Sequence, residues 1–145
     1  MYRRVNGLEV FLVHPGGPYF AKKDLGAWTI PKGEYLEGEP ALEAAKREFQ
    51  EETGFPVSKP FLELGSITQK GGKIVTAWAF EGNCDPAKMI SNHCEIEWPA
   101  RSGRMIEIPE ADRGAWFSID EAKDRIKETQ IPLLNRLGAT LNLPK

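Results

Sequence analysis

Cysteine and histidine are both scarce, with two of each among the 145 residues. Cys84 and Cys94 have neither a C-x-x-C pair nor a histidine cluster beside them, so the pattern gives no support to a zinc site. We expect two free thiols in a reducing cytoplasm, with a disulfide as the less favoured alternative. His14 and His93 stand apart in the sequence, and neither is assigned a catalytic role.

Long hydrophobic runs are also missing. No apolar stretch approaches the roughly 20 residues that a membrane-spanning helix needs. The apolar stretch nearest the N-terminus, LEVFLV at 8–13, is interrupted by Glu9 and predicts a strand rather than a signal peptide. A formal net charge of −2 gives no general basic footprint, so a nucleic-acid partner is disfavoured and no membrane partner is indicated.

The chain does contain enough apolar residues for one core. Its 145 residues are 41% hydrophobic, which predicts a single domain over 1–145. The predicted strands cover 8–13, a short piece before Pro31, 61–69, 73–82 and a stretch ending at Phe117, and the predicted helices cover 40–53, a stretch opened by Ser118 and the region 128–141. This alternation predicts an α/β fold with a sheet packed against helices.

The boundaries of these elements follow from particular residues. Pro40 suits the first turn of a helix, and Gly54 suits the position just after one. Ser118 and Glu121 form an S-x-x-E capping box at the start of the later helix. The segment 82–109 is polar and predicts irregular structure.

Three glutamates crowd one edge of the helix predicted over 40–53. Glu48, Glu51 and Glu52 are spaced i, i+3 and i+4 and fall within an arc of about 100°. This arc borders the apolar stripe that contains Phe49. Like charges at such spacing destabilise a helix by a few tenths of a kcal/mol, and a hard cation such as Mg²⁺ reverses that effect because it prefers oxygen ligands. The alternative is a solvated acidic face.

The residues around this trio follow a longer pattern. Gly33 is followed after five residues by Glu39, and after seven more by R-E-F-x-E-E-x-G-F from Arg47 to Phe55. The pattern resembles the complete signature of the Nudix hydrolases, and a match this long at fixed spacing is specific. The segments GAWTIPKGEYLEGE and AWFSIDEA also resemble this family. The resemblance implies a Nudix-type α/β/α sandwich, with a mixed central sheet packed between helices.

The same resemblance implies a reaction and a cofactor. Nudix enzymes hydrolyse a phosphoanhydride bond in a nucleoside diphosphate linked to another moiety, and they generally use Mg²⁺ or Mn²⁺. Carried onto matching positions, Glu51 and Glu52 are the principal metal ligands, and Glu48 is a further ligand or the general base. Arg47 holds Glu51 or its neighbours in place. The backbone carbonyl of Lys32 is an additional ligand.

Three signature positions receive supporting roles. Gly33 makes the turn from the loop into the helix. Glu39 lies at the helix entrance, where a negative side chain suits the helix dipole, and structural and catalytic roles remain equally open for it. Gly54 ends the helix.

The family often has one more acid outside the signature, on the loop before a late tryptophan. Glu110 lies six residues before Trp116 and is the first choice for this general base or ligand. Glu107 is the second choice and Asp112 the third, and plain surface charge is the alternative for all of them. Whether Glu48 or Glu110 is the base stays open.

Substrate contacts are expected from cations and aromatic rings. The candidates for phosphate contacts are Lys32, Lys22, Lys23, Arg101 and Arg104, with an ordinary surface cation as the alternative for each. The two arginines rank slightly above the lysines because the glycine of RSGR allows close backbone approach. Trp98 is the preferred ring for stacking on a nucleobase, with Tyr19 and Phe20 also considered. Trp28 and Trp78 fall on predicted strands and are expected to be structural.

The substrate is not determined at this stage. The tyrosine typical of diadenosine-polyphosphate hydrolases and the proline typical of ADP-ribose hydrolases are both absent from TQKGGKIV. The lead-in and the spacing from Glu110 to Trp116 nevertheless resemble the diadenosine-polyphosphate type, and a nucleoside triphosphate is an equal candidate. RNA 5′ ends are disfavoured by the charge.

The competing class is a non-catalytic Nudix-fold module that binds a nucleotide, which the complete set of signature carboxylates argues against. The number of metal ions stays open, as does the choice between monomer and homodimer. The chain begins near Tyr2, almost inside the first strand that the family leads one to expect.

Overall fold

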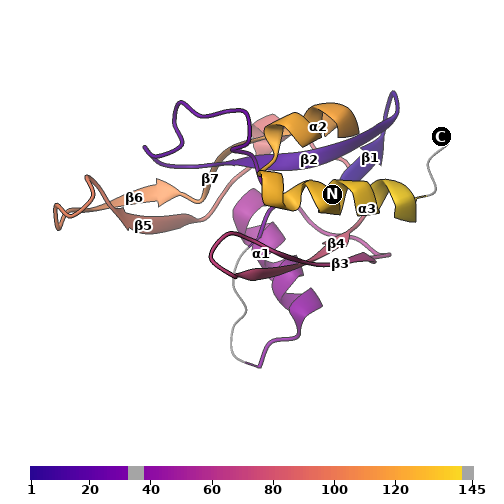
Figure 1. Cartoon of the computed structure of the whole chain (residues 1–145), viewed down its shortest axis with the longest axis horizontal. Coiled ribbons are helices and arrows are strands. Elements are labelled where there is room, and N and C mark those ends of the chain that lie inside the picture. Colours follow the sequence, from indigo (N-terminus) through magenta and orange to yellow (C-terminus); the bar gives the residue numbers. More distant parts are fainter. Residues whose placement is uncertain (33–37, 142–145) are drawn as a thin grey trace.

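The computed structural model describes residues 1–32 and 38–141 (Figure 1). Their order in the chain is β1 (Tyr2–Arg4), β2 (Leu8–Pro15), α1 (Ala41–Thr53), β3 (Leu62–Thr68), β4 (Ile74–Ala79), η1 (Pro86–Lys88), β5 (His93–Glu97), β6 (Met105–Pro109), β7 (Ala111–Ser118), α2 (Ile119–Arg125), η2 (Glu128–Gln130) and α3 (Ile131–Thr140). Gly33 falls outside the described residues.

The central strands form a mixed sheet. β2 pairs antiparallel with β1 on one side and with β7 on the other, with Phe11 opposite Trp116. β1 also contacts the end of β4 in parallel, because Tyr2 donates to the Phe80 carbonyl at 3.0 Å and accepts from the Gly82 N–H at 2.9 Å. The antiparallel pair of β3 and β4 continues from there.

Alternating side chains of the sheet face two different helical layers. Val10 and Leu12 of β2 belong to a buried cluster with Leu134 and Leu137 of α3. On the opposite face, Phe80 packs edge-on against Phe49 of α1, with ring centroids 5.1 Å apart. The period-two alternation of a strand therefore buries both faces, and the predicted α/β/α sandwich with a mixed sheet is confirmed.

Helix α1 begins and ends close to its predicted limits. Pro40 is the residue before the first helical one rather than the first helical residue itself. Gly54 adopts φ 77°, and its N–H donates to the Gln50 carbonyl at 2.8 Å. A left-handed residue at this point is the usual end of a helix, and glycine adopts it without a Cβ clash.

The prediction of irregular structure over 82–109 is wrong for the two strands β5 and β6. The segment contains a hairpin of β5 and β6, in which Cys94 lies opposite Ile108, and this hairpin projects from the body of the molecule (Figure 1). Its turn is held by the Glu97 carboxylate, which accepts from the N–H groups of Arg101 at 2.9 Å and Gly103 at 3.1 Å.

The C-terminal third agrees more closely with expectation. The Ser118 hydroxyl accepts from the Glu121 N–H at 3.2 Å, so the capping box is present at the start of α2. The region expected to be helical over 128–141 divides into η2 and α3. Cys84 and Cys94 are free thiols. Within the described ranges, every helix is too short or too polar to cross a membrane.

Candidate active site

Helix α1 presents its three clustered glutamates at different depths. The Glu52 residue is only 5% exposed, the Glu48 side chain is 12% exposed, and the Glu51 side chain is 42% exposed. They share one edge of the helix, as the spacing predicted. The cluster therefore runs from the protein interior to the solvent.

Arg47 ties this cluster to the helix entrance. Its Nε and Nη2 donate to the two carboxylate oxygens of Glu39, both at 3.0 Å. Its Nη1 donates to Glu48 Oε1 at 2.9 Å and to Glu51 Oε2 at 3.1 Å. These contacts, led by that with Glu39, raise the pKa of Arg47. Glu39 thus has a structural position, because it orients the arginine that orients the other two acids.

Glu52 is held from the opposite side. The Lys32 backbone N–H donates to Glu52 Oε2 at 2.9 Å, which fixes the segment before Gly33 against the end of α1. Burial, together with the nearby charges of Glu110 and Glu48, raises the pKa of Glu52 to about 7 against the opposing effects of the Lys32 N–H and the Lys32 charge. An acid with this pKa in a cleft is a candidate for a functional group.

Glu110 lies between β6 and β7 and faces the acids of α1. Burial raises its pKa, and the charges of Glu48 and Glu51 add to the effect. Its carbonyl accepts from the Gly16 N–H at 3.1 Å. A Cβ on Gly16 would lie 2.0 Å from the Pro109 carbonyl oxygen, so glycine is required for β2 to approach the loop that carries Glu110.

The other two acids considered for this position lie elsewhere. Glu107 is exposed on β6. Asp112 bonds to the buried His14, with 3.0 Å between Asp112 Oδ1 and His14 Nδ1. The other ring nitrogen of His14 lies 2.6 Å from the Lys23 carbonyl, so this histidine links the end of β2 to two other segments.

A cleft of about 250 Å³ opens between these elements. It contains two of the acids, Glu52 and Glu110, and two lysines, Lys32 and Lys127. The remaining lining residues are Pro15, Gly16, Phe20, Thr29, Cys94 and Ile108. The cleft therefore combines an acidic wall with a basic one.

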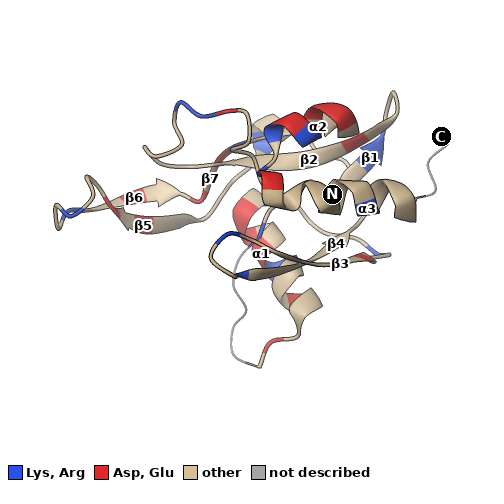
Figure 2. Ribbon diagram, viewed as in Figure 1, with Lys and Arg blue, Asp and Glu red and all other residues tan. Residues whose placement is uncertain are grey.

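The structure does not bring every predicted substrate contact to this cleft. Arg101, Arg104 and Trp98 lie at the turn of the β5–β6 hairpin and are absent from the cleft lining. Figure 2 shows the basic residues of this turn at the outer end of the hairpin. Trp98 instead packs edge-on against Tyr19, with centroids 4.8 Å apart. The predictions for Arg101, Arg104 and Trp98 rested on side-chain type, and the hairpin carries all three away from the cleft.

Lys127 is the cleft residue that sequence reasoning missed. It follows α2, and its N–H donates to the Trp28 carbonyl at 2.8 Å. Lys32 was predicted to contact the substrate, whereas Lys127 is a single lysine after a helix and belongs to no motif. The parallel contact between Trp28 and Ile126 places Lys127 next to the segment of Lys32.

The donor set fits Mg²⁺ or Mn²⁺ by its chemistry. Carboxylate and carbonyl oxygens are the ligands that these ions prefer. Among the described residues, however, the acidic, histidine and cysteine side chains do not gather in threes as ligands around one point. The three carboxylates already accept hydrogen bonds from within the protein. Arg47 donates to Glu48 and Glu51, and the Lys32 backbone N–H donates to Glu52. A bound ion would have to compete with Arg47 for two of these carboxylates.

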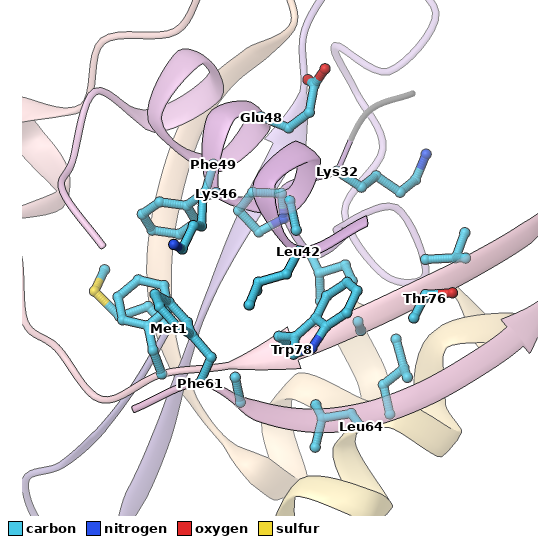
Figure 3. A pocket seen from close by; sticks show the side chains of 18 of the residues that line it. Met1, Lys32, Leu42, Lys46, Glu48, Phe49, Phe61, Leu64, Thr76 and Trp78 are labelled. Atoms are coloured by element: carbon cyan, nitrogen blue, oxygen red, sulfur yellow. The ribbon is translucent and has the colours of Figure 1, made fainter. Parts of the chain in front are cut away.

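A second cavity, also of about 250 Å³, lies between α1 and the β3–β4 hairpin. Its lining is mainly apolar and includes Leu42, Phe61, Leu64 and Trp78 (Figure 3). Glu48 and Lys32 border it, but their charged ends point away from its interior (Figure 3). Trp78 therefore has the structural position that was predicted for it.

Solved structures of the same fold cover nearly the whole chain. An Ap4A hydrolase from C. elegans, in a binary complex, matches with a TM-score of 0.67 at 21% identity, over 97% of this chain and 93% of that one. The E. coli ORF135 protein matches with a TM-score of 0.57 at 20% identity, over 97% and 86% of the two chains. A mutT/nudix family protein from Listeria innocua gives a TM-score of 0.57 at 19% identity, over 97% and 87%.

A search among curated proteins gave no sequence match. The family model for the NUDIX domain matches residues 3–137. This match covers the signature helix, the mixed sheet and Glu110. The chain therefore belongs to the NUDIX domain family.

Proposed function

We propose that the protein is a pyrophosphohydrolase that cleaves a phosphoanhydride bond in a nucleoside diphosphate linked to another moiety. One observation carries the proposal: Glu52 of α1 and Glu110 line the same cleft, and burial together with the charges of neighbouring acids raises the pKa of both. The acids could hold a metal ion and the neighbouring lysines could bind phosphate oxygens. This arrangement suits a substrate whose phosphates contact both.

The carboxylates would divide into ligands and a base. Glu51, Glu52 and Glu48, with the Lys32 carbonyl, would hold Mg²⁺ or Mn²⁺. When bound, such an ion neutralises phosphate charge and lowers the pKa of a bound water. Arg47 keeps two of the carboxylates in place through its own hydrogen bonds.

Glu110 is the better candidate for the general base. The Glu48 carboxylate already accepts a hydrogen bond from Arg47 at 2.9 Å, so it is engaged in holding the cluster. Glu110 has no carboxylate hydrogen bond within the described part of the chain, and burial raises its pKa, which makes it a better proton acceptor than an ordinary carboxylate. Gly16 and Asn92 fix its backbone through hydrogen bonds of 3.1 Å and 2.9 Å.

The substrate would be a nucleotide with a phosphate chain, either a dinucleoside polyphosphate or a nucleoside triphosphate. Similarity to the C. elegans Ap4A hydrolase supports the first at the level of fold. We expect this reaction to take place in the cytoplasm, by a monomer or a homodimer.

A substrate panel tests the proposal. The panel contains nucleoside triphosphates, dinucleoside polyphosphates, ADP-ribose, NADH and sugar nucleotides, with Mg²⁺ or Mn²⁺ at mildly alkaline pH. We expect turnover of at least one polyphosphate, and Glu52→Gln should remove nearly all of it while the protein stays folded. Binding without turnover across the panel would favour the non-catalytic module.

A further inference from the structure

Lys127 is a half-buried cation on the basic wall of the cleft. Its backbone is fixed by the hydrogen bond to Trp28, and the neighbouring Ile126 is only 1% exposed. Its Nζ lies 5.8 Å from the centroid of the Phe20 ring, which also lines the cleft. The side chain is therefore held in the cleft rather than extended into solvent.

No carboxylate neutralises this lysine within the described ranges. Two arginines that are also partly shielded from solvent do have acidic partners: Arg3 pairs with Glu9 at 2.8 Å and Arg125 pairs with Asp24 at 2.6 Å. An exposed lysine needs no partner because water solvates it, whereas a half-buried one loses part of that solvation. Burial and the charge of Lys32 accordingly lower the pKa of Lys127.

The two lysines occupy different positions along the cleft. Lys32 lies beside the acids, because its backbone N–H donates to Glu52 Oε2 at 2.9 Å. Lys127 is anchored further along the same wall, where its N–H donates to the Trp28 carbonyl at 2.8 Å and its amine faces the Phe20 ring. The order along the cleft is therefore acids, Lys32, Lys127. Two neighbouring cations repel each other unless an anion lies between them.

Resting on the proposed function, we propose that Lys127 and Lys32 form a subsite for the phosphates that lie beyond the bond that is cut. This subsite selects substrates with three or more phosphates in a row over those whose second moiety is a neutral sugar. Ammonium groups bind phosphate oxygens through charge-assisted hydrogen bonds. A diphosphate held at the acidic wall would reach Lys32, whereas only a longer phosphate chain would also reach Lys127.

Substitution of Lys127 tests this selectivity. Lys127→Met removes the charge and keeps an unbranched apolar stem, and Lys127→Arg keeps the charge. We expect Lys127→Met to lower kcat/KM for a tri- or tetraphosphate substrate about tenfold more than for ADP-ribose, mainly through KM, as loss of one charge-assisted contact implies. Lys127→Arg should restore most of the preference. Equal losses on both substrate types would overturn the proposal.

Lys123→Met is the matched control, because Lys123 lies on α2 and is absent from the cleft lining. It should leave the preference for long phosphate chains unchanged.

A binding measurement separates this proposal from the proposed hydrolysis. Inorganic tripolyphosphate is titrated into the metal-free protein by calorimetry, with orthophosphate as the reference. We expect tripolyphosphate to bind more tightly to the wild type than to Lys127→Met, even if the wild type hydrolyses nothing in the panel. Equal affinity of the two proteins for tripolyphosphate would overturn the subsite, whatever the outcome of the activity assays.

Discussion

Glu52 is the most deeply buried acid in the described part of the chain. Its spacing in the signature predicted that it would lie on the same edge of the helix as Glu48 and Glu51, and α1 places it there. Its depth was not predictable, because it depends on the segment of Lys32 that closes over the end of the helix. Burial, which Lys32 only partly offsets, makes this carboxylate costly to ionise.

The first prediction concerns the stability of the metal-free protein against pH. The pKa of Glu52 is about 7 in the folded state and near 4.5 when unfolded, so the folded state binds the proton more tightly. Stability from this group is therefore full below about pH 4.5 and is lost as pH rises through about 7, by on the order of 3 kcal/mol.

Urea unfolding of the wild type and of Glu52→Gln would measure this loss. Glutamine cannot ionise, so without metal the variant should be the more stable protein at about pH 8 and similar to the wild type at about pH 4.5. A stability difference that stays constant across this range would contradict the prediction. Added Mg²⁺ should stabilise the wild type more than the variant.

The second prediction separates Glu110 from its neighbours. If Glu110 is the base, Glu110→Gln should lower kcat by about 10²–10⁴, and the fall in kcat toward acid pH should disappear with it. Glu107→Gln is the control, since Glu107 is exposed on β6. If kcat of Glu110→Gln still fell toward acid pH as in the wild type, Glu48 would be the better candidate for the general base.

Helix α1 is the element that the sequence described best. Its limits, its acidic edge and its apolar stripe followed from helix period and from Pro40 and Gly54. The β5–β6 hairpin was missed because its strands are short and carry few large apolar residues. Ile96 and Ile108 do alternate with polar residues, and the ring pair of Tyr19 and Trp98 lies at the end of the hairpin.

The third prediction tests the anchoring of α1. Arg47 makes hydrogen bonds to three glutamates, and the ammonium of a lysine cannot reproduce this planar fork. Arg47→Lys should lower activity or metal affinity about 10- to 100-fold. Its unfolding midpoint should change little, because the arginine side chain is 27% exposed and such pairs add little stability.

Glu43→Gln is the control for this substitution. It breaks an exposed pair with Lys46 on the same helix, with 3.1 Å between the charged atoms, and activity should be unaffected. Equal losses in both variants would mean that general helix charge, rather than Arg47, supports the site.

For the whole molecule, the alternation of strands and helices predicted the α/β class, and the signature predicted the sandwich. The order of strands could not be derived, because the parallel contact of Tyr2 with Glu81 joins residues far apart in the chain. Lys127 escaped notice for the same reason. A single domain over 1–145 stays a prediction.

The fourth prediction concerns the apolar cavity between α1 and the β3–β4 hairpin. Ala45 lines it from the helix, so Ala45→Leu should fill part of the space and raise the free energy of unfolding by about 0.5–2 kcal/mol. Ala139→Leu adds the same atoms to an exposed position of α3 and should have little effect. A less stable Ala45→Leu protein would show that the larger side chain strains the packing.

The apolar cavity borders α1, the helix that carries the acids of the candidate site. Its presence should make the protein sensitive to hydrostatic pressure. Hydrostatic pressure favours states that eliminate internal voids, and the volume change of unfolding scales with the void volume that is lost. Leu134 and Leu137 of α3 line the same cavity as Leu42 and Trp78. Water forced into it under pressure should therefore loosen both helical layers together, and activity should fall at the pressures at which the packing of α3 against β2 is lost.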